Sequence, residues 1–202
     1  PSRGLGDVYK RQYFNKEKRM NTKGLFEKTM MKIWAHRGCS QNYPENTMTA
    51  FEKACAIPGL AGIETDIQIS KDGHLMVFHD ERIERTTDGT GFLRDYTYEE
   101  LRRLRIDAGD GKNEQIPCIE ELLELLQDKV REDAAFKLNI ELKNSVYPYP
   151  GMEEKIVDLI HKRGLQKHIV YSTFYAKSLE KLAGIDSCLL YTSPSPRDGA
   201  TS

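Results

Sequence analysis

The sequence predicts an α/β fold whose sheet is largely parallel. Segments in which apolar and polar residues alternate, the period of a β-strand, recur along the chain. Between them lie segments whose apolar residues recur at the period of an α-helix. Because a helix between two strands returns the chain to the same end of the sheet, this order is typical of parallel strands.

Alternation is clearest in two of the expected strands. In residues 62–70, Ile63 and Ile67 lie on one side of the strand, and Glu64 and Asp66 lie on the other. Residues 136–143 alternate in the same way. The expected strands are residues 32–36, 62–70, 75–78, 136–143 and 168–173.

The connection between the second and third strands contains the turn signal Asp72-Gly73. A two-residue hairpin turn at this point would place His79 opposite Asp66. The alternative is that the two strands are parallel neighbours in a barrel. In either case Asp66 and His79 lie at the same edge of the sheet.

Helices are expected between the strands. Thr97 and Glu100 form a capping box, a signal for a helix start. Gly164 is the expected stop of a later helix. The expected helices begin at residues 47 and 97 and span residues 118–130, 152–163 and 176–183.

The composition is typical of a soluble globular protein. Of the 202 residues, 39% are hydrophobic and 30% are charged, and the formal net charge is −1. This charge and the scattered basic residues argue against a nucleic-acid partner. No apolar run approaches the ~20 residues that span a bilayer, so we expect no stable membrane insertion. The cysteine spacing predicts reduced thiols, and no secretory signal is visible in the sequence, so we expect a cytoplasmic location. The sequence leaves the oligomeric state open.

Both ends of the chain differ from its middle. One DNA sequence that encodes residues 2–12 also encodes residues 188–198 on its opposite strand, read one base out of frame. This DNA resembles a transposon-type sequencing adaptor. We therefore expect residues 1–12 and 188–202 to be adaptor-derived, residues 13–29 to be a leader of uncertain origin, and residues 30–187 to form the domain.

Carboxylates on the expected strands are the first indication of function. Glu64 and Asp66 share one face about 7 Å apart, and they repel each other unless a proton, water or a cation lies between them. Glu141 lies on the polar face of another strand. Such oxygen ligands suit Mg²⁺ or Ca²⁺. The alternative is that these polar faces are the solvent-exposed side of an antiparallel sheet.

Two histidines and two cationic residues accompany the carboxylates. His36 and His79 each follow an expected strand, and the carboxyl ends of strands form the active-site face of α/β barrels. A pair of histidines can act as general acid and general base. Arg37 and Lys143 are suited to holding a phosphate. This set of residues favours phosphoryl-ester chemistry, whereas the motifs of nucleotide-binding and serine-hydrolase sites are missing from the sequence.

A series of short motifs, in order, resembles those of the glycerophosphodiester phosphodiesterase family. The motifs are AHRG at 35–38, PENT at 44–47, ETD at 64–66, KDG at 71–73, VFHD at 77–80 and NIELK at 139–143. The resemblance implies a TIM-like (β/α)8 barrel. Such a barrel usually takes about 250 residues. We expect it to be incomplete here, with about five of its eight strands present.

The resemblance also implies an activity. This is the metal-dependent hydrolysis of small-molecule glycerophosphodiesters to sn-glycerol 3-phosphate and an alcohol. The roles that it implies are acid–base catalysis by His36 and His79, binding of Mg²⁺ or Ca²⁺ by Glu64, Asp66 and Glu141, and phosphate binding by Arg37 and Lys143.

Two alternatives to this activity stay open. One is a phospholipase-type phosphodiesterase of similar barrel fold, which an apolar rim would favour, although the loops read as polar. The other is a non-catalytic binding module. Because about three barrel strands are missing, the chain by itself is expected to be inactive.

Overall fold

The structure is a computed structural model that describes residues 32–109, 111–186 and 190–192. The expected adaptor-derived residues 1–12 and the expected leader, residues 13–29, lie outside these ranges, as do residues 188–189 and 193–202. Within the second expected adaptor segment, Leu190–Thr192 forms strand β8 and pairs with β7 (Ile169–Ser172). The expected domain boundaries therefore remain predictions.

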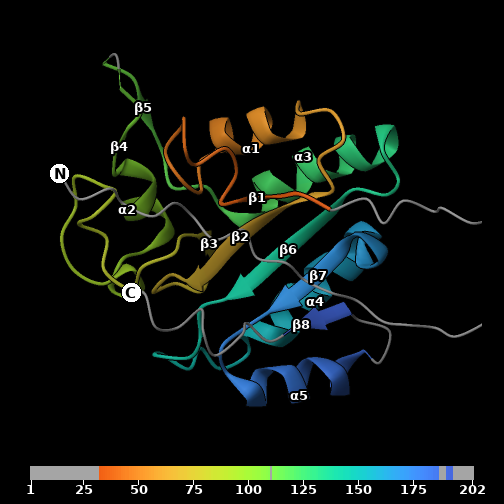
Figure 1. Ribbon diagram of the computed structural model, residues 1–202. Helices are drawn as coiled ribbons and strands as arrows, with labels where there is room; N and C mark the ends of the chain where they lie inside the picture. The colour runs from red at the N-terminus through yellow and green to blue at the C-terminus, as the bar shows by residue number, and fades with distance from the viewer. Residues whose placement is uncertain (1–31, 110, 187–189, 193–202) are drawn as a thin grey trace, which may run out of the picture. The chain divides into compact units, whose positions relative to one another are not determined.

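The main sheet is largely parallel, and its one antiparallel pair among the described residues is the hairpin between the second and third strands. Among the described residues its order is β1 (Trp34–His36), β2 (Gly62–Ile69), β6 (Lys137–Leu142), β7 and β8, and each of these strands runs parallel to its neighbour. The arrowheads of β2, β6 and β7 point the same way in Figure 1. Because β1 and β8 end the order, the described strands form an open part of a barrel. The predicted α/β class, with an incomplete barrel, is confirmed.

Helices connect the parallel strands, as the periodicity predicted. The Thr47 side chain caps the first helix by accepting a hydrogen bond from the Ala50 backbone N–H. The predicted capping box of Thr97 and Glu100 is present, and Gly164, with a φ of 68°, ends α4. None of the described helices is long and apolar enough to cross a membrane. The helices are α1 (Met48–Cys55), α2 (Tyr98–Arg103), α3 (Ile119–Glu132), α4 (Met152–Arg163) and α5 (Ala176–Ile185), with the 3₁₀ turns η1 (Leu93–Asp95) and η2 (Gln166–His168).

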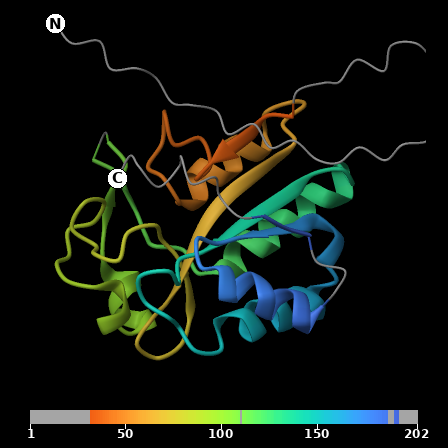
Figure 2. The ribbon, with the colours of Figure 1, turned by 60° about the horizontal axis from the view of Figure 1, so that its bottom comes forward.

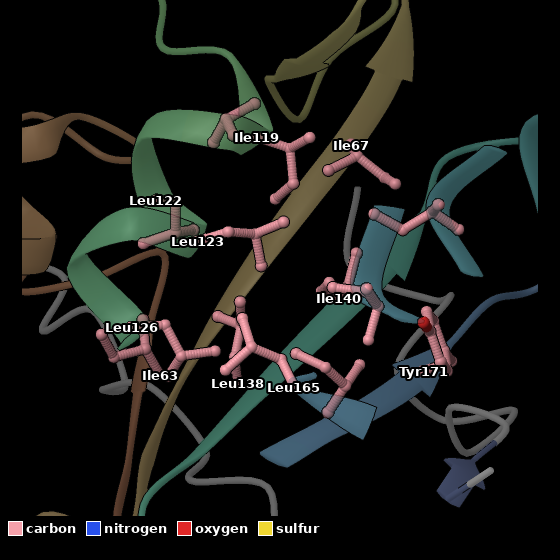
Figure 3. Packing of buried hydrophobic residues seen from close by; sticks show 14 of the residues in the cluster. Ile63, Ile67, Ile119, Leu122, Leu123, Leu126, Leu138, Ile140, Leu165 and Tyr171 are labelled. Carbon is pink, nitrogen blue, oxygen red and sulfur yellow. The ribbon is translucent and has the colours of Figure 1, made fainter. Parts of the chain in front are cut away.

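The main core lies between the sheet and the helices. Ile63 and Ile67 on one face of β2 pack in the same buried cluster as Ile119 and Leu123 of α3 (Figure 3). Each of these side chains is at most 1% exposed. Full burial of a branched aliphatic side chain stabilises a fold by about 1.5–3 kcal/mol. The apolar face of β2 is therefore fixed toward α3, and the carboxylates on alternate positions must face the other way.

The polar face of β2 is also buried. Glu64 is 8% exposed and Asp66 is 1% exposed, and Glu141 on β6 is 5% exposed. The alternative of a solvent-exposed polar face is therefore wrong. In an open antiparallel sheet such residues would face water, whereas both faces of a barrel strand are covered.

The connection between β2 and β3 (Leu75–Val77) is a hairpin with one more turn residue than expected. The Ser70 backbone N–H donates to the His74 carbonyl oxygen, and Ser70 Oγ accepts from the His74 N–H. Ser70 Oγ also donates to Asp72 Oδ1 at 2.7 Å. Gly73 has a φ of 89°, a left-handed conformation that lets the longer turn close without strain.

This turn corrects the predicted register by one residue. β2 and β3 are antiparallel, and Ile67 lies opposite Val77. The residue opposite Asp66 is therefore Phe78, whose backbone N–H donates to the Asp66 carbonyl oxygen at 3.0 Å. The prediction that His79 lies opposite Asp66 is wrong, because the turn between Ser70 and His74 contains three residues and not two, which moves the register by one.

A smaller unit follows the hairpin and was only partly predicted. In Figures 1 and 2 the yellow-green segment that contains α2 gathers near the carboxyl end of β2. It includes a short hairpin of β4 (Ile106–Asp107) and β5 (Asn113–Glu114), which the alternation pattern did not reveal because each strand has two residues. Its separate apolar cluster consists of Met76, Phe78, Ile83, Leu93, Leu101, Ile106, Ile116 and Cys118.

The start of β2 offers a test of the strand packing. A Cβ added at Gly62 would collide with the Lys137 carbonyl oxygen and would lie 2.6 Å from the Trp34 ring. Gly62→Ala should therefore lower the free energy of unfolding by about 2 kcal/mol in urea denaturation, because the strands must move apart. The control is Gly184→Ala in α5, where an added Cβ meets nothing within 4 Å and should not destabilise the fold. Equal stability of Gly62→Ala and the unchanged protein would contradict the observed packing.

Candidate active site

Three carboxylates converge in the middle of β2 and at the carboxyl end of β6, near the point where β1 ends. The parallel register places Asp66 directly beside Glu141, and Glu64 lies on the same face of β2. One carboxylate oxygen from each residue lies within 4.8 Å of the other two. The pairing of β2 with β6 thus brings together the three residues that are predicted from the sequence to be metal ligands.

Arg37 contacts this carboxylate cluster from the loop after β1. Its backbone N–H donates to Glu64 Oε2 at 3.0 Å, and its Nε lies 3.2 Å from Asp66 Oδ2. Its Nη1 donates to Glu45 Oε1 at 3.1 Å. The φ of Arg37 is 56°, in the left-handed region that a non-glycine residue adopts at a cost of about 1–3 kcal/mol. The surrounding contacts therefore hold a strained residue against the acids.

Asn46 is a buried site residue to which the sequence gave no role of its own. Its Nδ2 donates to Asp66 Oδ2 at 3.0 Å, and its Oδ1 accepts from Thr65 Oγ1 at 3.0 Å. Its backbone N–H donates to the Arg37 carbonyl oxygen at 3.1 Å. Its φ of 57° is left-handed as well. The signal that could have found it is the PENT motif at residues 44–47, in which asparagine is the residue that best tolerates this conformation.

Burial and like charge act together on Glu64. Loss of hydration, followed by the charges of Asp66 and Glu141, raises the pKa of Glu64 well above its ordinary value of 4.5. The positive charge and backbone hydrogen bond of Arg37 oppose this rise without cancelling it. Arg37 therefore does not compensate Glu64 for its burial beside two like charges.

Lys143 joins the carboxylates to His79. Its Nζ donates to Glu141 Oε1 at 3.1 Å and lies 3.2 Å from His79 Nε2. On the other side of the ring, His79 Nδ1 lies 2.5 Å from Asp80 Oδ1. If Nδ1 carries the proton toward the Asp80 carboxylate, Nε2 is free to accept from the Lys143 ammonium group. This arrangement presents a basic nitrogen toward the cluster.

His36 approaches the cluster from the end of β1. It lies beside Glu64 in the parallel register of β1 and β2, and its Nε2 is 3.6 Å from Glu64 Oε2. The His36 side chain is 54% exposed. It can therefore exchange protons with solvent, whereas the carboxylate beside it is buried.

A further layer of ion pairs holds the His79 segment. Arg85 Nη2 lies 2.6 Å from Glu45 Oε1, and Arg85 Nε also donates to Asp80. Burial acts to raise the pKa of Asp80, but hydrogen bonds from Arg85 and His79 outweigh it and leave the pKa lowered. Glu45 behaves in the same way, with a pKa lowered by Arg85 and Arg37. Both acids therefore stay ionised near neutral pH and keep their partners in place.

The structure brings all the predicted site residues into one connected group. The contacts above link His36, Arg37, Glu64, Asp66, His79, Glu141 and Lys143 through steps of at most 4.8 Å. Three buried carboxylates beside one another have the donor chemistry of a hard divalent-cation site, so these residues fit such an ion. Asn46, Glu45 and Arg85 support this group. The PENT motif that contains Glu45 and Asn46 was expected to have a supporting or loop-structural role, whereas Arg85 was not predicted at all.

Comparisons with known proteins agree on one family. Residues 36–193 match the family model described as "Glycerophosphoryl diester phosphodiesterase family". A glycerophosphodiester phosphodiesterase of Bacillus altitudinis is 48% identical over 155 residues, which are 74% of this chain and 60% of that protein. The chain therefore spans about 60% of the length of a curated relative that it matches.

Solved structures share the fold. The crystal structure of glycerophosphodiester phosphodiesterase from Agrobacterium tumefaciens aligns with a TM-score of 0.68 and 30% identity, over 80% of this chain and 66% of that one. A phosphodiesterase of Oleispira antarctica, solved in complex with the product sn-glycerol 3-phosphate, aligns with a TM-score of 0.64 and 28% identity. That alignment covers 83% of this chain and 69% of the other.

The raised pKa of Glu64 gives a testable effect on stability. A carboxyl group whose folded pKa exceeds its unfolded pKa binds its proton more tightly in the folded state, so stability falls as the pH rises from about 4.5 to the raised folded pKa. Glu64→Gln should therefore raise the free energy of unfolding at pH 7.5 in EDTA, because the variant carries no charge to bury. Urea denaturation measures this difference.

The same measurement at low pH serves as the control. Below about pH 4, Glu64 is protonated in both the folded and the unfolded chain, and the difference between variant and parent should vanish. A Glu64→Gln protein that is less stable than its parent at pH 7.5 would show that attraction to Arg37 outweighs the repulsion.

Proposed function

This chain belongs to the glycerophosphoryl diester phosphodiesterase family, and from this membership we propose that the protein hydrolyses glycerophosphodiesters to sn-glycerol 3-phosphate and an alcohol. The observation that carries the proposal is the buried cluster of Glu64, Asp66 and Glu141 with two histidines next to it. His36 contacts Glu64, and His79 contacts Lys143, which donates to Glu141. Such a cluster, lined by cations at the carboxyl ends of barrel strands, suits a phosphodiester substrate.

The proposal includes a metal ion. Glu64, Asp66 and Glu141 would hold Mg²⁺ or Ca²⁺, which when bound supplies positive charge to the phosphate oxygens. Arg37 and Lys143 would bind the same phosphate group through charge-assisted hydrogen bonds. Arg37 has a donor to offer, because among the described residues its buried Nε has no aligned hydrogen-bond partner, although Asp66 is close.

The two histidines would exchange protons with the reacting oxygens. One takes a proton from the nucleophile as the new P–O bond forms, and the other donates a proton to the alcohol oxygen as the old P–O bond breaks. Asp80 orients His79 through Nδ1, as an acid behind a catalytic imidazole does in other enzymes. The nucleophile is either water or the glycerol hydroxyl next to the ester. Attack by the hydroxyl gives a cyclic phosphate, which water then opens to glycerol 3-phosphate while the two histidines exchange roles.

A phospholipase-type phosphodiesterase is the second candidate, and one observation favours it. The loops after β6 and β7 were read as polar, but they expose Val146 (68%), Tyr147 (41%) and Phe174 (43%). The Phe174 ring centroid lies 5.9 Å from Lys143 Nζ. Exposed apolar groups beside the site could contact an acyl chain. A preference for lysophosphatidylcholine over glycerophosphocholine would support this candidate.

The acid–base proposal predicts that both histidines are needed for turnover. His36→Ala and His79→Ala should each slow the release of glycerol 3-phosphate from glycerophosphocholine by roughly 10²–10⁴-fold. The assay uses this chain and a chimera that continues with the part of the B. altitudinis relative beyond the match. His74→Ala is the control, because His74 lies on the β2–β3 turn and stacks on Tyr98. Full activity of either variant would exclude that histidine from the mechanism.

The metal proposal predicts a loss of cation binding that does not depend on turnover. Mg²⁺ or Ca²⁺ at 100 times its dissociation constant should stabilise the parent protein by about 2.7 kcal/mol, seen as a higher melting temperature. Asp66→Asn and Glu141→Gln should abolish this shift. Asp158→Asn, an exposed change in α4, should retain it. An unchanged shift in Asp66→Asn or Glu141→Gln would rule out the proposed ligand set.

A further inference from the structure

A buried glutamine bridges two segments beside the candidate site. Gln68 lies on β2 beyond the carboxylates and is 0% exposed. Its Nε2 lies 2.6 Å from the Asp80 carbonyl oxygen, and 3.2 and 3.3 Å from the carbonyl oxygens of His79 and Phe78. Its Oε1 accepts a hydrogen bond from the Tyr149 hydroxyl at 3.1 Å. One side chain therefore joins the His79 segment to the loop after β6.

The backbone carbonyl groups of Phe78, His79 and Asp80 require hydrogen-bond donors. β3 ends at Val77, and the carbonyl groups that follow lie beyond the β2–β3 ladder. A carbonyl that is shielded from water without a partner costs about 1–3 kcal/mol. The two hydrogens on Gln68 Nε2 serve this group of carbonyls, so its oxygen must face Tyr149. The orientation of the amide is thus fixed from both sides.

Tyr149 is itself held in place. It lies between Pro148 and Pro150, whose rings restrict the backbone, and its carbonyl oxygen accepts from the Met152 N–H at 3.1 Å. Burial raises the pKa of its hydroxyl to about 12, so the hydroxyl remains a donor at neutral pH. The hydrogen bond to Gln68 therefore persists throughout the range in which a phosphodiesterase of this kind would be assayed.

Two separate links then join the His79 segment to the end of β6. One is the side-chain contact between His79 Nε2 and Lys143 Nζ at 3.2 Å. The other runs from the backbone of His79 and Asp80 through Gln68 to Tyr149. We propose that Gln68 and Tyr149 are a positioning pair that fixes the backbone of His79, so that its imidazole faces Lys143 across the candidate site. The catalytic consequence rests on the proposed function, whereas the structural link does not.

Two substitutions separate this pair from general effects on the fold. Gln68→Met keeps the side-chain length but removes the donors, and it should lower kcat for glycerol 3-phosphate release about tenfold. Tyr149→Phe removes only the hydroxyl and should lower kcat about threefold. Tyr171→Phe is the matched control, because the buried Tyr171 hydroxyl has no hydrogen-bond partner among the described residues and its loss should leave kcat unchanged. A kcat unchanged by Gln68→Met would overturn the proposal.

A double-mutant cycle tests whether Gln68 acts through His79. If it does, Gln68→Met should change the residual rate of His79→Ala by less than about twofold, because the group that it positions is already gone. A merely structural role would reduce both proteins by the same factor. Equal losses in the two backgrounds would therefore overturn the positioning role.

Hydrogen exchange provides a readout that needs no activity. Gln68→Met should speed amide exchange in a peptide covering residues 78–81 by about tenfold, and Tyr171→Phe should leave it unchanged. If the parent protein releases no glycerol 3-phosphate, the proposed function is wrong. The exchange rates still test whether Gln68 holds the His79 backbone, because they do not depend on activity. Unchanged exchange in Gln68→Met would overturn the link, whatever the activity.

Discussion

The repulsion among three buried carboxylates is the constraint on which the rest of the site depends. At 4.8 Å, two unit charges repel by on the order of 3 kcal/mol for an effective dielectric constant of about 20. The side chains of Glu64, Asp66 and Glu141 cannot move apart, because the pairing of β2 with β6 fixes their backbones. The carboxylates are therefore stabilised by positive groups and hydrogen-bond donors from the neighbouring loops.

These stabilising groups belong to a chain of ion pairs in which positive and negative side chains alternate. Arg37 adopts a left-handed backbone to reach two of the acids, and a non-glycine residue keeps such a conformation only where its surroundings compensate for it. Glu45 then binds both Arg37 and Arg85, so the second arginine can hold Asp80. The loops after β1 and β3 are thereby tied to one charge pattern that begins at the carboxylates.

The sequence was most informative where a pattern had only one physical solution. Period-two alternation in residues 62–70 required one buried apolar face, which α3 covers, and therefore a second face that carries Glu64 and Asp66. Capping signals placed the helix ends because they act within one turn of the chain, as the boxed Thr97 and Glu100 show. The cluster of three carboxylates could be predicted because parallel strands run in the same direction side by side. Their polar residues therefore meet regardless of the length or structure of the connecting segments.

The remainder escaped prediction because it depends on side chains that meet only in the folded state. The β2–β3 register shifted by one residue, since Ser70 and a left-handed Gly73 close a longer turn than Asp72-Gly73 alone indicates. Gln68 looked like an ordinary polar residue on an alternating strand. Its importance arises from carbonyl groups ten to twelve positions later in the sequence.

This difference explains why the metal-ligand candidates were easier to find than the groups around them. Acids on neighbouring strands are specified by residue type and by period, both of which are local properties of the sequence. The position of His79 depends on three independent supports: the ion pair through Asp80, the contact with Lys143, and the backbone hydrogen bonds to Gln68. The contact with Lys143 and the hydrogen bonds to Gln68 join segments that are distant in the chain. An imidazole that is held by several contacts stays in one orientation, and a fixed orientation is what the proposed proton transfer by His79 requires.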